Sequence, residues 1–186
     1  PINNYNVTFY MGKYLVTYDT LNSNNQKILL KYYTLPYNKD KFTNYFKQSK
    51  IVLNTFIKIF GDYPFILDGY GLVESPYSGM EHQTVIAYGN KIIQHYNNNN
   101  DKIVNYDQII IHETAHEWWG NAISASDMAD IWLHEGFATF SELLFYENVS
   151  NKKDYLKELI KIINYIYNLW PVVGNYEVNE NTFITN

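Results

Sequence analysis

Two histidines and a glutamate within five residues constrain this chain more than any other feature. His112 and His116 are four residues apart, and Glu113 directly follows the first histidine. Residues four apart lie on the same face of an α-helix, so this H-E-x-x-H spacing predicts a helix that directs both imidazoles to one point. Glu113 lies about 100° around that helix, at about 3.6 residues per turn. It is therefore expected beside a bound metal ion, where it can accept a proton from water.

A third metal ligand is expected from the segment 130–140. Eighteen residues separate His116 from Glu135, which is enough chain to finish one helix, turn, and begin a second helix that passes the first. Two histidines and one glutamate leave the fourth tetrahedral position of zinc open, as in catalytic zinc sites. Glu142 falls on the same helix face as Glu135 and is a candidate to accept a hydrogen bond from a ligand histidine. An exposed helix carboxylate is an equally good interpretation of Glu142.

Composition narrows the ligand chemistry and the partners. The chain of 186 residues contains no cysteine, so thiolate ligands are excluded and histidine with glutamate remains the option for one Zn²⁺ per chain. The formal charge is −5 and every cation is a lysine, which argues against a nucleic-acid partner, since phosphate-binding surfaces are basic and use arginine. No apolar run reaches the ~18 residues of a membrane span. The chain begins and stops in mid-pattern, so further domains of a longer protein are expected as its partners.

The spacing of apolar residues predicts an α+β fold, in which a mixed β-sheet is followed by the helices that carry the zinc site. Runs rich in β-branched and aromatic residues predict strands over residues 5–18, 28–33, 63–67, 71–76 and 84–89. Near-helical spacing predicts helices from Asn38 to Gly61, from Asp107 to Gly120, from Asp127 to about Tyr146, and over residues 152–170.

A further motif lies about thirty residues ahead of the first zinc histidine. Residues 79–82 read Gly-Met-Glu-His, and with H-E-x-x-H at 112–116 and Glu135 behind it the chain resembles the M1-family zinc aminopeptidases, which are gluzincins. Members of that family carry a G-x-M-E-N motif, an H-E-x-x-H-x18-E zinc site and a thermolysin-like catalytic domain. The Gly-Met-Glu-His-Gln variant and Trp-Trp-Gly-Asn at 118–121 are similar to a bacterial branch.

The resemblance implies a role for each matching residue. His112, His116 and Glu135 would bind Zn²⁺, Glu113 would be the general base and proton shuttle, Glu81 would bind the free α-ammonium group of a peptide, and Gly79 and Met80 would offer backbone to the substrate chain. A free amine differs from an internal peptide nitrogen mainly by its positive charge, so a carboxylate at a set distance from zinc selects N-termini. The implied function is zinc-dependent hydrolysis of the N-terminal peptide bond. A thermolysin-like endopeptidase and a non-catalytic zinc-binding scaffold remain the alternatives.

Two residues depart from the family pattern. His82 and His134 stand where asparagine is common, and neither departure removes a ligand; no role in metal binding is assigned to His134 or to Glu117. The resemblance assigns residues 1–37 to the closing strands of an N-terminal β domain and its lead-in, and 38–186 to a C-terminally truncated catalytic domain. The tyrosine that stabilises the oxyanion in this family is expected beyond the chain. These 186 residues alone are therefore expected to bind zinc but to have low activity.

Overall fold

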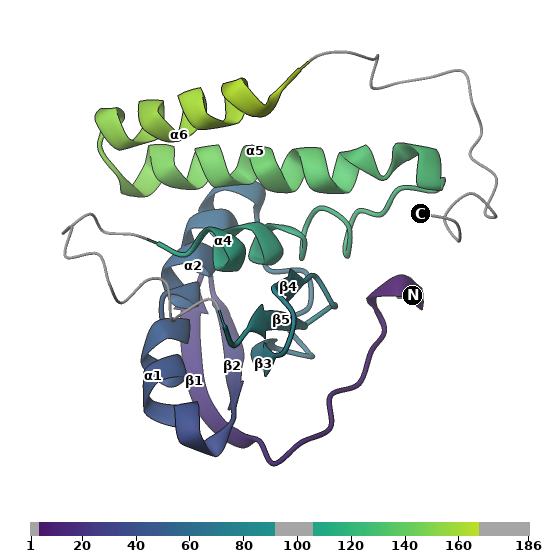
Figure 1. Cartoon of the computed structure of the whole chain (residues 1–186), viewed down its shortest axis with the longest axis vertical. Coiled ribbons are helices and arrows are strands. Elements are labelled where there is room, and N and C mark those ends of the chain that lie inside the picture. The colour runs from purple at the N-terminus through teal and green to yellow at the C-terminus, as the bar shows by residue number, and fades with distance from the viewer. Residues whose placement is uncertain (1–3, 92–105, 168–186) are drawn as a thin grey trace.

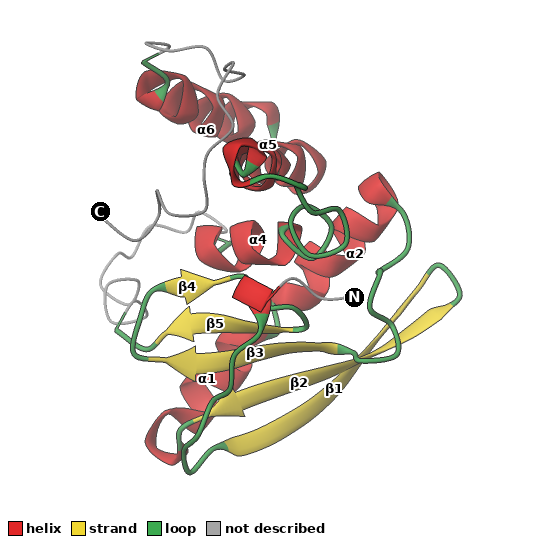
Figure 2. Ribbon diagram, turned by 90° about the vertical axis from the view of Figure 1, so that its right-hand side faces the viewer, coloured by secondary structure: helices red, strands yellow, loops and turns green. Residues whose placement is uncertain are grey.

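A five-stranded mixed sheet forms the base of the molecule. In this computed structural model, which describes residues 4–91 and 106–167, helices cover one face of the sheet and the N-terminal segment crosses the other (Figure 1, Figure 2). The strand order is β1-β2-β3-β5-β4, with β1–β2 and β4–β5 antiparallel and β2–β3 and β3–β5 parallel. The strands are β1 (Leu15–Ser23), β2 (Gln26–Thr34), β3 (Tyr70–Ser75), β4 (Gly79–Met80) and β5 (Val85–Gly89). The predicted mixed-sheet α+β fold is confirmed.

The hairpin β1–β2 forms where the residues between the strands tolerate positive φ. Asn24 and Asn25 have φ of 46° and 63°, and asparagine adopts this region more readily than most residues. The predicted strand over residues 5–18 is wrong in its first part, because residues 4–6 form the short 3-10 helix η1 and 7–14 form no regular element. The assignment of residues 1–37 to a separate domain stays a prediction; β2 pairs with β3, so the hairpin belongs to the same sheet as the later strands.

The region between β2 and β3 contains two helices where one was predicted. The 3-10 helix η2 (Pro36–Asn38) leads into α1 (Lys39–Phe46), and after a break α2 (Ser49–Phe60) follows. The break is occupied by Gln48, whose side chain donates to the Tyr45 carbonyl and accepts the backbone N–H of Asp107. Gly61, at φ 95°, ends α2 as predicted. The predicted strand at 63–67 is wrong, because these residues form a turn and the Tyr63 side chain is buried in the core.

Three α-helices stack above the sheet, and the first two carry the candidate site. These are α4 (Gln108–Ala115), α5 (Trp132–Val149) and α6 (Lys152–Tyr165). Asp107 caps α4 as predicted, accepting the N–H of Ile110 at 3.0 Å. Asp127 caps the 3-10 helix η3 (Met128–Asp130) that precedes α5.

The helix predicted over 152–170 ends at Tyr165, and residues 168–170 lie outside the described residues. Figure 2 shows α4 next to the sheet, α5 above it and α6 outermost. None of the helices in the described ranges combines the length and the apolar character needed to cross a membrane.

Candidate active site

Two helices bring three candidate metal ligands to one point. His112 lies in the last turn of α4, His116 directly follows that helix, and Glu135 lies in the first turn of α5. The Nε2 atoms of the two histidines are 3.2 Å apart, and Glu135 Oε2 is 3.2 Å from that of His112 and 3.7 Å from that of His116. The three side chains predicted to share an ion therefore converge in the folded chain. That they bind zinc stays a prediction.

Hydrogen-bond partners orient both imidazole rings. His112 Nδ1 is 2.7 Å from Glu142 Oε1, and His116 Nδ1 is 2.9 Å from the carbonyl oxygen of Trp119. Both partners are acceptors, so each Nδ1 carries the hydrogen and each neutral Nε2 directs a lone pair at the shared point. Glu142 is buried rather than exposed. This arrangement is the one in which a carboxylate or carbonyl orients a zinc-bound histidine.

The shared point requires positive charge. Two Nε2 lone pairs and a carboxylate oxygen converge there, and two histidines with one carboxylate match the ligands that zinc prefers. Without a metal ion, burial lowers the pKa of His112, but its hydrogen bonds with Glu135 and Glu142 outweigh this and raise the pKa to about 10. Burial lowers the pKa of His116. Two imidazoles and a carboxylate that favour positive charge at one point fit Zn²⁺.

Glu113 lies beside the three ligands, between α4 and β4. Burial raises the pKa of Glu113 to about 8; His112 opposes this shift, and nearby carboxylates including Glu81 add to it. Its Oε2 is buried and has no hydrogen-bond partner in the described part of the chain. Its Oε1 leaves no room for a side chain at Gly79, where an added Cβ would lie 2.5 Å away. A carboxylate with a pKa near neutrality is suited to accept and return a proton.

Glu81 follows the edge strand β4 and is buried. One carboxylate oxygen of Glu81, one of Glu113 and a ring nitrogen of His116 all lie within 4.8 Å of one another. Gly79 and Met80 pair with β5 on one side only, because β4 is the last strand of the sheet order. The predicted amine-binding carboxylate and the strand predicted to hold the substrate chain are therefore brought next to the metal ligands.

A comparison with known families identifies the chain. The model described as the peptidase family M1 domain matches residues 44–169, which is more than half of the sequence. The chain belongs to peptidase family M1. Its M1 relatives include mitochondrial aminopeptidase 2 of Saccharomyces cerevisiae, which is 28% identical over 145 residues, or 73% of this chain and 15% of that protein. Mouse aminopeptidase N is 36% identical over 67 residues, or 34% of this chain and 6% of that protein.

A solved structure shares the fold of this M1 chain. The M1 zinc metallopeptidase from Deinococcus radiodurans superimposes with a TM-score of 0.59 at 20% identity, covering 89% of this chain and 35% of that one. A second crystal structure, of a mutant of that enzyme with a Tyr-Ser-Ala substrate, gives a TM-score of 0.61 at 19% identity and covers 89% and 35% of the two chains. The predicted family is confirmed, and so is the thermolysin-like fold.

Glu117 is a buried carboxylate next to His116 in the chain, and the sequence alone indicates no role for it. It is fully buried and accepts hydrogen bonds from the Tyr63 hydroxyl at 2.6 Å, the Thr84 N–H at 2.9 Å and Asn121 Nδ2 at 3.3 Å. Burial raises the pKa of Glu117 to about 7, although these hydrogen bonds lower it. Glu117 thus ties the end of α4 to the loop before β5. Its only sequence signal is its position next to His116, a predicted ligand.

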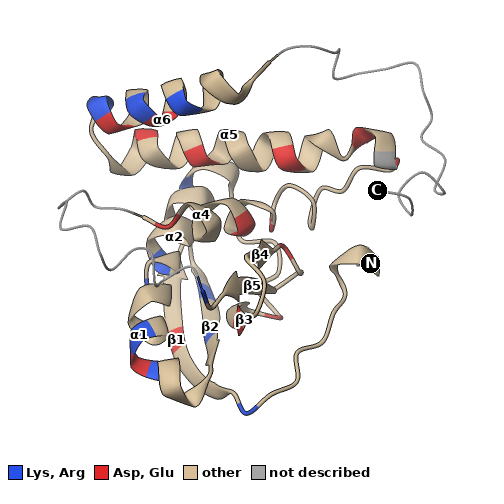
Figure 3. Cartoon of the chain, viewed as in Figure 1, with Lys and Arg blue, Asp and Glu red and all other residues tan. Residues whose placement is uncertain are grey.

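An apolar groove between α5 and α6 adjoins Glu135, one of the predicted metal ligands. Its volume is about 940 Å³, within the ~300–1,000 Å³ typical of ligand pockets. Glu135 and Glu142 lie on its α4 side, and apolar residues form most of its wall: Trp132, Phe140, Leu143, Leu159, Ile162 and Ile163. Figure 3 shows acidic residues along α5 and lysines along α6. The groove offers apolar side chains a place directly beside the predicted zinc ligands.

Proposed function

We propose that this M1 chain is the catalytic part of a zinc-dependent aminopeptidase, which hydrolyses the first peptide bond of peptides with a free N-terminus. The observation that carries the proposal is the position of two carboxylates, the buried Glu81 and the partly buried Glu113, which lie with a ring nitrogen of His116 within 4.8 Å of one another. One carboxylate beside a metal can serve as a base, and a second gives the site a partner for a cationic amine. The aminopeptidase names of its relatives support the same activity.

Each group of the proposed site has a separate role in hydrolysis. His112, His116 and Glu135 would hold Zn²⁺, which would supply a Lewis acid for the scissile carbonyl and for water. Glu113 accepts a proton from the attacking water at its unpartnered Oε2 and returns it to the nitrogen of the leaving amine. Glu142 keeps the hydrogen of His112 on Nδ1, so that Nε2 stays available to the ion. The free edge of β4 gives an extended peptide backbone groups to pair with.

The first experiment tests the choice between an aminopeptidase and an endopeptidase. In the zinc-loaded protein, Glu81→Ala should lower kcat/KM for peptides with a free N-terminus by about 10- to 100-fold, because a charge-assisted hydrogen bond is lost. Cleavage of the N-acetylated peptides should not change. Glu147→Ala, at an exposed position of α5, is the matched control. Equal losses on both substrates, or rapid cleavage of acetylated peptides by the wild type, would favour the endopeptidase.

The second experiment tests catalysis against a scaffold role. Glu113→Gln keeps the size of the side chain and removes its capacity to accept a proton, so the variant should retain zinc and lose hydrolysis. Metal analysis measures the first property and peptide cleavage the second. A variant that retains wild-type function would favour the scaffold alternative.

The activity of these 186 residues on their own is a separate proposal. The family resemblance places the oxyanion-stabilising tyrosine outside them, and losing a main oxyanion donor costs about 10²–10³ in rate. We therefore expect the isolated chain to bind zinc and to hydrolyse amino-acyl amides slowly. Turnover as fast as that of an intact M1 enzyme would contradict this expectation.

A further inference from the structure

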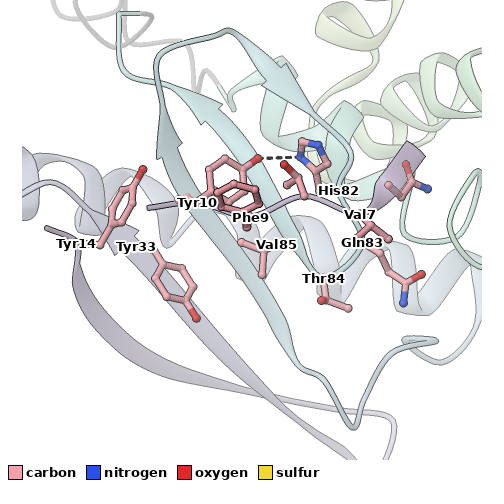
Figure 4. Close-up of a pocket in the computed structure, with 12 residues that line it drawn as sticks. Val7, Phe9, Tyr10, Tyr14, Tyr33, His82, Gln83, Thr84 and Val85 are labelled. Carbon is pink, nitrogen blue, oxygen red and sulfur yellow. Dashed lines mark hydrogen bonds between the residues drawn. The ribbon is translucent and has the colours of Figure 1, made fainter. Parts of the chain in front are cut away.

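The N-terminal segment, defined here as residues 5–10, crosses the face of the sheet opposite the helices and approaches the candidate site (Figure 2). Its apolar side chains are not buried against the sheet: Val7 is 59% exposed and Phe9 is 85% exposed. A pocket of about 390 Å³ remains between the segment and the sheet, with Tyr33 and Val85 on the sheet side (Figure 4). Apolar packing therefore does not explain the path of this segment.

Polar contacts at both ends of the segment explain its path better. Tyr10 contacts His82, Asn6 contacts Asn121, and Tyr5 contacts His134. None of the three partners is a proposed metal ligand or base. His82 directly follows Glu81 in sequence, and His134 directly precedes Glu135. Asn121 donates a hydrogen bond to the carbonyl oxygen of Glu81. The three partners include both histidines that stand where the family pattern has asparagine.

The contact of Tyr10 fixes the residue after Glu81. The Tyr10 hydroxyl is 2.8 Å from His82 Nδ1 and 2.8 Å from the Tyr77 hydroxyl, and the rings of Tyr10 and His82 meet edge to face (Figure 4). A hydroxyl can donate one hydrogen bond and accept another, so Tyr10 can satisfy both neighbours. Through these contacts, Tyr10 holds the loop that carries Glu81.

The contact of Asn6 acts on the same loop through one intermediate. Asn6 Nδ2 donates to Asn121 Oδ1, and Asn121 Nδ2 donates to the carbonyl oxygen of Glu81 at 3.1 Å and to Glu117 Oε1 at 3.3 Å. Asn121 is 7% exposed, so water competes little for its amide. Because both ends of this amide are engaged, the Glu81 backbone is tied to the end of α4 and to the N-terminal segment together.

The contact of Tyr5 anchors the segment beside α5. His134 Nε2 accepts the N–H of Ala125 at 2.8 Å, so in the neutral ring the hydrogen is on Nδ1, which donates to the Tyr5 hydroxyl at 3.1 Å. The two rings also stack, with an interplanar angle of 17°. This contact holds the far end of the segment, while Asn6 and Tyr10 contact the surroundings of Glu81.

We propose that the N-terminal segment is a positioning element for recognition of the substrate amine, in which Tyr10 through His82 and Asn6 through Asn121 hold Glu81 in place. The inference rests on the proposed function and deepens it. It explains His82 as the partner of Tyr10 rather than as a group that contacts substrate. Asn6 and Tyr10 are positioning residues, because they act on the amine only through Glu81.

The test measures binding rather than turnover. In the zinc-loaded Glu113→Gln protein, calorimetry gives the Kd of leucinamide and of N-acetyl-leucinamide. Tyr10→Phe and Asn6→Ala should each weaken leucinamide binding by about three- to tenfold, the effect of one lost hydrogen bond, and leave N-acetyl-leucinamide binding and zinc content unchanged. Tyr18→Phe, at an exposed tyrosine of β1, is the matched control and should change neither Kd.

A double-mutant cycle with Glu81→Ala tests whether Tyr10 affects amine binding through Glu81. If Tyr10 acts through Glu81, then Tyr10→Phe should have no further effect once Glu81 is alanine. Equal losses with and without Glu81, or equal losses for both ligands, would overturn the inference and show that the segment only supports the fold. If Glu81→Ala weakens leucinamide binding and Tyr10→Phe does not, this inference alone fails. If Glu81→Ala has no effect on leucinamide, amine recognition by Glu81 fails as well.

Discussion

At the scale of single residues, the position of the proposed base Glu113 depends on Gly79. The Glu113 carboxylate lies so close to the backbone of β4 that a Cβ on Gly79 would be 2.5 Å from Oε1 and 2.9 Å from Ile109 Cγ2. Real Cβ contacts are not this short, so either β4 or Glu113 must move if a side chain is added. The absence of a side chain at position 79 thus determines where the proposed base can stand.

Gly79→Ala should therefore lower kcat by at least about tenfold and leave zinc content unchanged. Displacement of a catalytic group by about 1 Å can cost ~10² in rate. The three heavy atoms nearest to the added Cβ belong to Glu113 and Ile109, and none belongs to a predicted zinc ligand. Steady-state kinetics and metal analysis provide the two measurements. Gly136→Ala is the matched control, because a Cβ there meets only Trp132 Cε3 at 3.8 Å. Full activity in Gly79→Ala would show that the Glu113 carboxylate can accommodate a side chain at position 79 and still act in catalysis.

The protonation of His112 predicts how zinc affinity depends on pH. Its pKa is raised to about 10 in the metal-free site, so the folded protein holds this proton throughout the neutral range, and zinc must displace it. Competition with the proton is stronger at lower pH, so zinc affinity should rise by about tenfold per pH unit between about pH 6 and 8.

Competition with a zinc indicator across this pH range measures the slope. Glu142→Gln removes one of the carboxylates that raise the pKa of His112, so the rise in affinity should level off at a lower pH than in the wild type. A zinc affinity that does not change with pH would contradict a protonated His112 in the metal-free site.

At the scale of elements, the start of α4 is the point where helix and sheet are joined. Asp107 caps α4 at Ile110 and also accepts hydrogen bonds from the hydroxyls of Tyr88 on β5 and Tyr45 on α1. A single buried carboxylate thus connects three elements beneath the candidate site. The position of His112 one turn later depends on this junction.

Asp107→Ala should lower the free energy of unfolding by about 2–4 kcal/mol. The loss of the cap costs about 1 kcal/mol, and the buried Tyr88 hydroxyl loses its acceptor at about 1–3 kcal/mol. Urea denaturation measures the change. Asp40→Ala, in the exposed first turn of α1, is the control and should shift stability by no more than about 0.5 kcal/mol. Similar effects of the two substitutions would mean that the junction contributes little.

At the scale of the whole molecule, the proposed zinc site links two layers. His112 and His116 belong to the α4 layer, which packs on the sheet, and Glu135 belongs to α5, which carries α6 on its outer side (Figure 2). An ion bound by all three would clamp the outer helices to the sheet. With an ion bound, the candidate site would therefore also join the two layers of the fold.

Removal of zinc by a chelator should lower the melting temperature and speed amide exchange at the start of α5. Zinc at 1,000 times its Kd stabilises the folded state by about 4 kcal/mol, and chelation removes this contribution. Differential scanning calorimetry and hydrogen exchange measure the two effects. The variant His112→Ala should not respond to the chelator. A wild-type protein equally insensitive to the chelator would rule out zinc as a clamp between the layers.

The sequence by itself determined the features that depend on short-range geometry. The four-residue spacing of His112 and His116 predicts convergence because helix periodicity is local, and the caps at Asp107 and Gly61 follow from the chemistry of single residues. The motif spacing to Glu135 also predicts the family, and the run of β-branched and aromatic residues at 28–33 predicts the strand found in β2. These features need little knowledge of distant parts of the chain.

Only the tertiary structure decided the features whose partners are far apart in sequence. The break in the helix predicted from Asn38 to Gly61 reflects the contact of Gln48 with Asp107, 59 residues away. The roles of Glu117 and Asn121, and the path of residues 5–10, depend on contacts of the same kind. The local sequence does not indicate which buried polar groups will form hydrogen bonds with each other in the folded chain. Each such group must find its hydrogen bonds in the fold as a whole, because burial without a partner is costly.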